Sequence, residues 1–206
     1  VRSYSKVNFS KSIFLEELLK ARKIIEDRHQ SLFIEELDDF INKVRIFGFH
    51  FATLDIRQDS RVHHQAFTQI VKDLKNIGET TLPKNYAYLP EEEQIKILAV
   101  VKGSINPKIL TDTISVSTIE SMYALKEIQL RNGERGANRY IISNNQTALN
   151  VMETFAMLNL CGFENELPVD VIPLFETVED LQNAAKVMRT LYSNRTYRYH
   201  LEKRKN

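Results

Sequence analysis

Two short segments constrain the fold of this chain most, because each reads as a strand that ends in a charged side chain and leads directly into a helix. They are residues 54–60 (LDIRQDS) and 171–177 (VIPLFET). The first carries Arg57, whose planar guanidinium can grip a phosphate or carboxylate with two parallel hydrogen bonds. The second carries Glu176, whose oxygens suit a hard cation such as Mg²⁺. Barrels of parallel strands carry their active residues at strand ends, so the pattern indicates a phosphorylated substrate handled beside a metal.

Strands and helices alternate over most of the remaining chain. Apolar residues at helical spacing predict helices over residues 10–29, 31–47, 60–77, 112–132, 147–161 and 177–192, and Pro90 with three glutamates after it begins another. Ser10 or Ser12 and then Ser31 are the expected N-caps of the first two helices, and Gly48 ends the second. We predict strands over residues 49–57, 139–143 and 169–175. The basic tail, residues 195–206, is interpreted as a solvated, frayed end.

Composition limits the class of protein. The chain is 43% apolar and 27% charged, which is typical of an ordinary globular domain. A net charge of +1 argues against nucleic acid as a partner, because nucleic-acid-binding domains usually carry a basic excess. No apolar run approaches the roughly 20 residues that span a bilayer, so we expect no membrane partner. The single cysteine, Cys161, cannot form an internal disulfide and fits the reducing cytoplasm, where we expect the protein to be located.

Both strand-end segments carry a family resemblance. Residues 55–60 (DIRQDS) and 173–181 (PLFETVEDL) resemble phosphoenolpyruvate carboxylase, whose sequences show D-[IV]-R-Q-[DE]-S and P-L-F-E-T-x-x-D-L in this order. Residues 140–143 (YIIS) fall between them, where the family has a strand ending Ile-Ser. The similarity extends over about residues 47–197, but residues 144–150 (NNQTALN) replace the family's usual Met-Ala-Lys-Thr-x-Ser-Asp. We therefore interpret the chain as a divergent member.

The resemblance implies a fold and a domain organisation. The fold is a helix-rich α/β structure, a partial parallel (β/α) barrel of the phosphoenolpyruvate/pyruvate TIM-barrel type with about three strands. Family chains are several times longer than 206 residues, and this one begins at Val1. We therefore expect residues 1–206 to be a single fragment of a catalytic barrel domain, with a helical lead-in (1–47) followed by strand–helix units (48–206).

The resemblance also implies an activity, which is the formation of oxaloacetate and phosphate from phosphoenolpyruvate and bicarbonate. Arg57 resembles the catalytic arginine that holds the substrate phosphate, and Leu174 resembles an apolar residue near the substrate's methylene carbon. Glu176 resembles one of two carboxylates that bind Mg²⁺ or Mn²⁺. The whole protein is implied to be a homo-oligomer, a tetramer in this family. Most of the barrel and the second metal carboxylate lie outside these residues, so we expect the fragment alone to be inactive.

The candidate residues could also have purely structural roles. Arg57 could form an ion pair with Asp55 or Asp59, although the resemblance makes Asp55 a residue that orients the guanidinium. Glu176 could be a charge at the positive end of a helix dipole. His63 and His64 are adjacent, so on a helix their side chains point about 100° apart and cannot both face one site. We favour a capping or packing role for His63.

Two rival functions remain open from the sequence. One is another metal-dependent barrel lyase that forms an enolate, and such enzymes carry a reactive cysteine in a short loop, whereas Cys161 falls at a predicted helix end. The other is a non-catalytic helical interaction module, which would leave Arg57 and Glu176 far apart. The carboxylase interpretation instead places both at one rim, with Ser143 on the same side and with Arg57 and Glu176 separated by roughly 8–15 Å.

Overall fold

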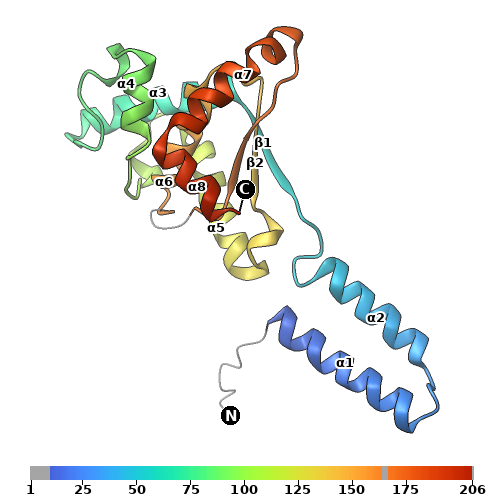
Figure 1. The fold of residues 1–206 in the computed structure, drawn as a ribbon. Coiled ribbons are helices and arrows are strands. Elements are labelled where there is room, and N and C mark those ends of the chain that lie inside the picture. The colour runs from blue at the N-terminus through green and yellow to red at the C-terminus, as the bar shows by residue number, and fades with distance from the viewer. Residues whose placement is uncertain (1–9, 164–166, 206) are drawn as a thin grey trace, which may run out of the picture. The chain divides into compact units, whose positions relative to one another are not determined.

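The computed structural model describes residues 10–163 and 167–205 and divides the chain into two compact units, Val1–Thr53 and Leu54–Asn206. The first unit is a helical hairpin of α1 (Lys11–Arg28) and α2 (Ile34–Phe47), which lie side by side in Figure 1. Phe14 and Phe40 pack edge to face between the helices, and Arg22 Nε donates to Asp38 Oδ1 at 2.6 Å. The hairpin has a small core, since Ile41 and Val44 are the only buried hydrophobic residues among its described positions.

The ends of the two hairpin helices test the predicted caps. Ser10 is the N-cap of α1, as predicted, because its hydroxyl accepts from the Ile13 N–H. Gly48 ends α2, as predicted. The prediction that Ser31 caps α2 is wrong: Phe33 is the N-cap, has a left-handed backbone (φ 59°) and makes no side-chain cap bond. Ser31 is itself left-handed (φ 59°) and contributes its carbonyl, which accepts from the Ile34 N–H at 3.2 Å.

The second unit contains a parallel three-stranded sheet in the order β1-β2-β3. Its strands are β1 (Asp55–Asp59), β2 (Arg139–Ser143) and β3 (Asp170–Pro173). The bounds predicted for β2 are confirmed. The other two strands are shorter than predicted, because β2 offers only five residues for pairing and residues 49–54 form turns and coil rather than strand. The predicted end of the first strand at Arg57 is wrong, since β1 continues for two more residues, to Asp59, and the next helix begins at Ser60. The predicted helix-rich α/β class is confirmed, with three parallel strands.

Six α-helices accompany the described sheet. The first five are α3 (Ser60–Asn76), α4 (Glu91–Leu98), α5 (Thr113–Asn132), α6 (Ala148–Asn159) and α7 (Val178–Ser193), and the short 3₁₀ turns are Tyr86–Tyr88, Pro107–Ile109 and Glu134–Gly136. Aspartates 59 and 112 cap α3 and α5 by accepting backbone N–H groups. Thr177 and Asp180 form a reciprocal capping box at the start of α7. Helix α6 ends two residues before the predicted end.

The basic tail is not a frayed end, so this prediction is wrong. Residues Arg195–Lys203 form a sixth helix, α8, whose Tyr197 is 2% exposed and whose His200 is 7% exposed. The Tyr197 hydroxyl donates to the Val171 carbonyl at 3.1 Å, and Arg204 Nε donates to Asp170 Oδ1 at 2.6 Å. The tail is therefore docked against β3 through both apolar and charged contacts.

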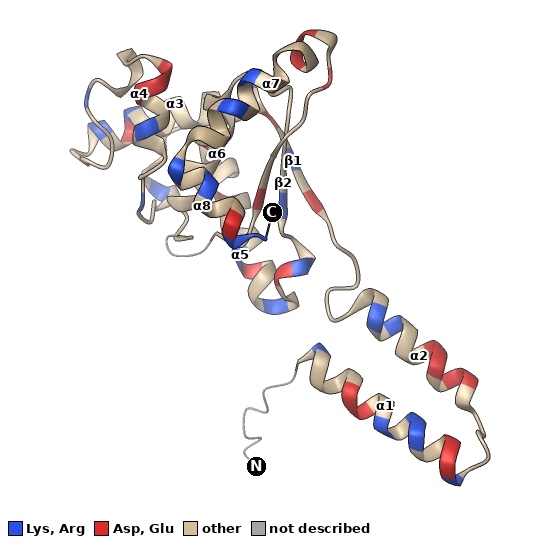
Figure 2. Cartoon of the chain, in the orientation of Figure 1, with Lys and Arg blue, Asp and Glu red and all other residues tan. Residues whose placement is uncertain are grey.

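The helices cover one face of the sheet. Figure 1 shows α6, α7 and α8 on the same side of the three strands. Side chains alternate along each strand, and on this side Tyr140, Ile142 and Val171 are buried. The opposite face carries Arg139 and Ile172, which are more exposed. Figure 2 shows Lys and Arg mixed with Asp and Glu over the same elements, as expected for a net charge of +1. Within the described residues no helix is long and apolar enough to cross a membrane.

Candidate active site at the carboxyl edge of the sheet

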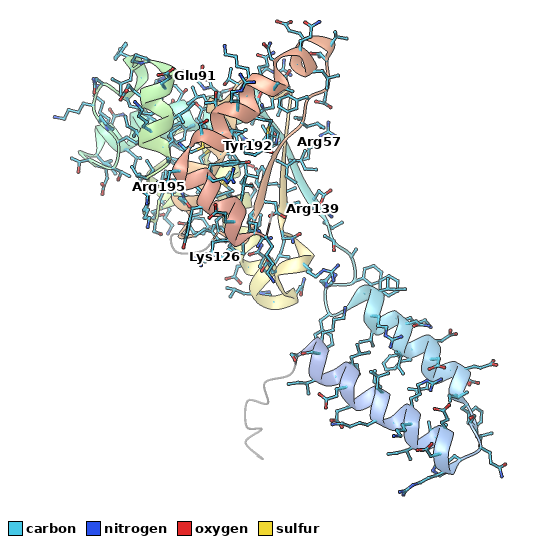
Figure 3. All side chains as sticks on the ribbon, viewed as in Figure 1. Arg57, Glu91, Lys126, Arg139, Tyr192 and Arg195 are labelled. Carbon is cyan, nitrogen blue, oxygen red and sulfur yellow. The ribbon has the colours of Figure 1, made fainter. Side chains whose placement is uncertain are left out.

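Arg57 and Glu176 meet where the strands end. Arg57 is the third residue of β1, and Glu176 follows β3 by three residues. The Arg57 Nη2 donates to Glu176 Oε1 at 2.5 Å, and the two side chains are 54% and 41% exposed. Figure 3 shows Arg57 beside the strands of the sheet. The predicted shared rim is therefore present, but the predicted separation of roughly 8–15 Å is wrong: the two side chains are long enough to reach each other and make direct contact.

The loop after β2 holds the second oxygen of Glu176. The Asn144 N–H donates to Glu176 Oε2 at 3.1 Å, and the Asn144 carbonyl accepts from the Ser60 hydroxyl at 2.5 Å. Asn144 has a left-handed backbone (φ 52°), which asparagine tolerates better than most residues. Both oxygens of Glu176 are therefore engaged, one by a guanidinium and one by a backbone amide.

The sequence did not identify Asn144 and Ser60 as part of this site. A backbone N–H carries no residue-type signal, and the loop at 144–150 was the place where the chain departs from the family pattern. The available signal was the asparagine directly after a predicted strand, which is a residue type suited to a left-handed turn.

Asp55 and Asp59 have other partners than Arg57. Asp55 Oδ1 lies 2.8 Å from Arg139 Nε, in the neighbouring strand. Asp59 accepts from the Arg61 guanidinium, and this hydrogen bond is the largest cause that lowers the pKa of Asp59 to about 2. The alternative in which Arg57 pairs with either aspartate is therefore wrong, and so is the orienting role predicted for Asp55.

Leu174 continues the sheet toward Glu176. Its N–H donates to the Ile142 carbonyl at 2.9 Å, and its carbonyl accepts from the Asn145 N–H at 3.3 Å. The residue is half-buried. These two bonds tie the segment between β3 and Glu176 to the end of β2, so they fix the backbone that presents Glu176.

The described residues do not form a complete metal site by themselves. In the two described ranges no group of three or more His, Cys, Asp or Glu side chains is arranged to hold a metal ion. Glu176 is a single carboxylate with both oxygens engaged. Mg²⁺ keeps most of its water unless several oxygen ligands converge, so Glu176 alone is a weak site for this ion.

The histidines after the first motif are structural. His63 is fully buried, with Nε2 3.0 Å from the Tyr140 hydroxyl and Nδ1 2.8 Å from Thr154 Oγ1. Burial lowers the pKa of His63 to about 4, so its ring is neutral at pH 7. The packing role predicted for His63 is confirmed. His64 lies 2.8 Å from the buried carboxylate of Glu153, and this hydrogen bond raises the pKa of His64.

Cys161 bears on the rival lyase function. Its side chain is completely buried in the core, and burial raises the pKa of the thiol to about 12. Thiolate is the reactive form of cysteine, so a buried thiol with this pKa is a poor nucleophile. The structure thus gives no support to a reactive-cysteine loop at Cys161. The other rival function, a helical interaction module, predicted that Arg57 and Glu176 lie far apart, and their direct contact does not fit it.

Comparison with known proteins decides the family. The family model for phosphoenolpyruvate carboxylase matches residues 3–206. The chain belongs to the phosphoenolpyruvate carboxylase family. The two strand-end motifs that suggested this family, at 55–60 and 173–181, therefore lie within the matched region.

Two curated relatives named phosphoenolpyruvate carboxylase are those of Parasynechococcus marenigrum and Synechocystis sp.. The chain is 33% identical to that of Parasynechococcus marenigrum over 172 residues, which is 80% of this chain and 16% of the relative. It is 31% identical to that of Synechocystis sp. over 193 residues, which is 89% of this chain and 18% of the relative. The chain thus spans less than a fifth of the length of these relatives.

Proposed function

We propose that this chain supplies Arg57, Leu174 and Glu176 to the active site of a phosphoenolpyruvate carboxylase, a carboxylating lyase. The substrates are phosphoenolpyruvate and bicarbonate, and the products are oxaloacetate and phosphate. The observation that carries the proposal is the contact of Arg57 with Glu176 at the carboxyl edge of a parallel sheet, in a chain of this family.

The proposed reaction needs a cation at the transferring phosphoryl group. Bicarbonate oxygen attacks phosphorus, which gives carboxyphosphate and the enolate of pyruvate. Carboxyphosphate then releases phosphate and carbon dioxide, and the enolate's methylene carbon attacks the carbon dioxide to form oxaloacetate. Arg57 suits the first step, because its half-exposed guanidinium can exchange the Glu176 carboxylate for a phosphate, two of whose oxygens can accept parallel N–H bonds. A fixed guanidinium there would stabilise the charge that develops in transfer.

We propose Glu176 as one oxygen ligand of Mg²⁺ or Mn²⁺, with the remaining ligands outside these 206 residues. The bound ion would supply Lewis acidity toward oxyanions. Arg57 and the ion would compete for the same carboxylate. If the phosphate of the substrate bound Arg57 in place of Glu176, the Glu176 carboxylate would become available to the ion. The described residues offer one carboxylate here, so the chain alone is expected to be inactive.

The wider context follows from the same proposal. The three parallel strands would be part of a TIM-type barrel, with Leu174 beside the substrate's methylene carbon, where an apolar side chain helps to keep water from the enolate. The uncovered sheet face would then line the barrel interior. The whole protein would be a homo-tetramer in the cytoplasm.

The test uses the protein expressed from the complete reading frame that contains this sequence. We expect bicarbonate-dependent oxaloacetate formation, measured by reduction with NADH and malate dehydrogenase. Arg57→Gln and Glu176→Gln should each lower kcat by about 10²-fold or more, as loss of a charged group at a developing charge does. Each should change the free energy of unfolding by less than about 1 kcal/mol, because the ion pair is solvent-exposed.

The matched controls are Arg131→Gln and Glu127→Gln, which break an exposed ion pair of α5 at 3.2 Å. We expect these controls to keep kcat within about twofold, since surface ion pairs contribute little. Full bicarbonate-dependent turnover in Glu176→Gln would show that Glu176 is only a charge at a helix end. No oxaloacetate formation by the unmodified protein would overturn the proposed function.

A further inference from the structure

A cavity of about 310 Å³ is lined by residues of α6 and α8 and by Phe163, Leu167 and Pro168. Its apolar walls include Phe155 of α6, Phe163 and Leu167 before β3, and Tyr199 of α8. This volume is at the lower end of the range for small-molecule sites, which are mostly apolar with a few polar groups. The cavity is therefore large enough for a compact organic molecule with one ring.

The cavity is separate from the candidate active site. It is lined by Pro168 and Arg204, and Arg204 pairs with Asp170, the first residue of β3. Arg57 and Glu176 meet instead at the opposite edge, where the strands end. Parallel strands begin at one edge of a sheet and end at the other. The Arg57–Glu176 site therefore leaves this cavity unexplained.

One wall of the cavity is a buried histidine with an unpaired nitrogen. His200 is 7% exposed, and its Nε2 is buried without a hydrogen-bond partner among the described residues. The ring packs edge to face on Phe155 at 5.3 Å between centroids. Burial lowers the pKa of His200 to about 4, so the ring is neutral at pH 7. An unpaired buried polar atom is costly, and a polar group of a ligand beside the ring would remove this cost.

The charged groups of the cavity favour an anion. Lys102 and Lys203 line it, and neither has an ion-pair partner within the described ranges, although the Lys203 ammonium lies 5.5 Å from the Tyr199 ring centroid. The Arg204 guanidinium is already engaged by Asp170 and by Glu134, a carboxylate that also lines the cavity. The cavity thus offers two ammonium groups without an ion-pair partner in the described ranges, and these would attract an anionic group such as a carboxylate.

We propose that this cavity binds a small aromatic carboxylate, with the carboxylate at Lys102 and Lys203 and a polar ring substituent beside His200. The aromatic and apolar walls would hold the ring of the ligand. The proposal goes beyond the carboxylase reaction and requires no catalytic step.

The probe is 4-hydroxybenzoate, titrated into the ¹⁵N-labelled 206-residue chain and followed by NMR. We expect saturable shifts of the His200 ring nitrogens and of α8 backbone amides. The uncharged analogue 4-hydroxybenzyl alcohol should bind about tenfold more weakly, because it lacks the charge that pairs with both lysines. The double variant Lys102→Met/Lys203→Met should weaken 4-hydroxybenzoate binding by a similar factor.

A matched double variant, Lys72→Met/Lys108→Met, removes two exposed lysines that do not line the cavity, and it should leave the affinity unchanged. His200→Phe keeps the ring packing and removes both nitrogens, so it should weaken binding several-fold. The absence of saturable His200 shifts, equal affinity for the uncharged analogue, or unchanged affinity in Lys102→Met/Lys203→Met would each overturn the proposal. The analogue comparison uses the unmodified chain, so it stands even if a variant fails to fold.

Discussion

Glu176 is held by two different donors, a guanidinium and a backbone amide. Exposed ion pairs usually contribute at most about 1 kcal/mol to stability, so the Arg57–Glu176 pair is not needed to hold the fold. The backbone bond to Asn144 instead fixes the position of the carboxylate. The contacts at this site therefore fix the positions of the Arg57 and Glu176 side chains and add little to the stability of the fold. Fixed positions of charged groups are what a binding site requires.

The buried His63 predicts a pH dependence. Its folded pKa of about 4 is below the unfolded value of 6.5, with burial as the largest cause and Asp59 opposing it. Between these values the unfolded state binds more protons, so stability is full above pH 6.5 and falls as the pH drops toward 4. From pH 7 to pH 5 this residue alone should cost roughly 2 kcal/mol. Urea unfolding at both pH values measures the loss.

An NMR titration assigns the effect to the residue. At pH 6 the His63 ring should still be neutral, while His64, whose pKa is raised by Glu153, should be largely protonated. The two adjacent histidines thus serve as controls for each other. A His63 ring that takes up its proton at pH 6.5 or above would contradict the burial argument.

The sequence predicted which side chains lie at this site better than it predicted their hydrogen-bond partners. Arg57 and Glu176 could be placed at one rim because strand ends of parallel strands share an edge. The partners of Asp55 could not be predicted, since register decides that Arg139 lies opposite it in β2. The amide of Asn144 was also beyond sequence reasoning, because any residue type carries an N–H.

At the scale of elements, local signals predicted most helices and failed where packing decides. Ser10, Asp112 and Gly133 mark helix ends through short-range bonds or glycine geometry, and the structure has all three as caps. Helix α8 was not predicted, because its many basic residues resemble a solvated tail, although Asn194 caps it by accepting from the Tyr197 N–H. Its stability comes from contacts with β3 and α6, which are distant in sequence.

The docking of α8 can be tested at Tyr197. Tyr197→Ala removes a side chain that is 2% exposed and that donates to the Val171 carbonyl. We expect a loss of about 3–5 kcal/mol in the free energy of unfolding, as for other large buried aromatic truncations. Urea denaturation of the 206-residue chain, followed by circular dichroism, provides the measurement.

The matched control is Tyr199→Ala in the same helix, whose tyrosine is 57% exposed. It should cost less than about 1 kcal/mol, mainly through helix propensity and partial burial. Equal losses in the two variants, or no loss at Tyr197, would mean that α8 is not docked as the structure has it.

At the scale of the whole molecule, the sequence predicted the class of fold but could not show whether the sheet closes into a barrel. Three parallel strands follow from the alternating strand–helix pattern. A barrel needs about eight strands, so three of them cannot show whether the sheet closes. The sequence predicted a helical lead-in over residues 1–47 within a single fragment, whereas the structure divides the chain into two compact units after Thr53.

The two units should differ in their ability to fold alone. The buried core cluster of the second unit runs from Ala66 to Tyr197 and includes residues of β2 and β3, and Ile56 of β1 packs against it. The first unit has Ile41 and Val44 as its buried hydrophobic residues among the described positions. Small cores rarely supply enough burial to offset chain entropy. Residues 54–206 should therefore unfold cooperatively in urea and keep their near-ultraviolet circular dichroism, whereas residues 1–53 should show no cooperative transition. Loss of the cooperative transition in residues 54–206 would mean that the hairpin is required for that core.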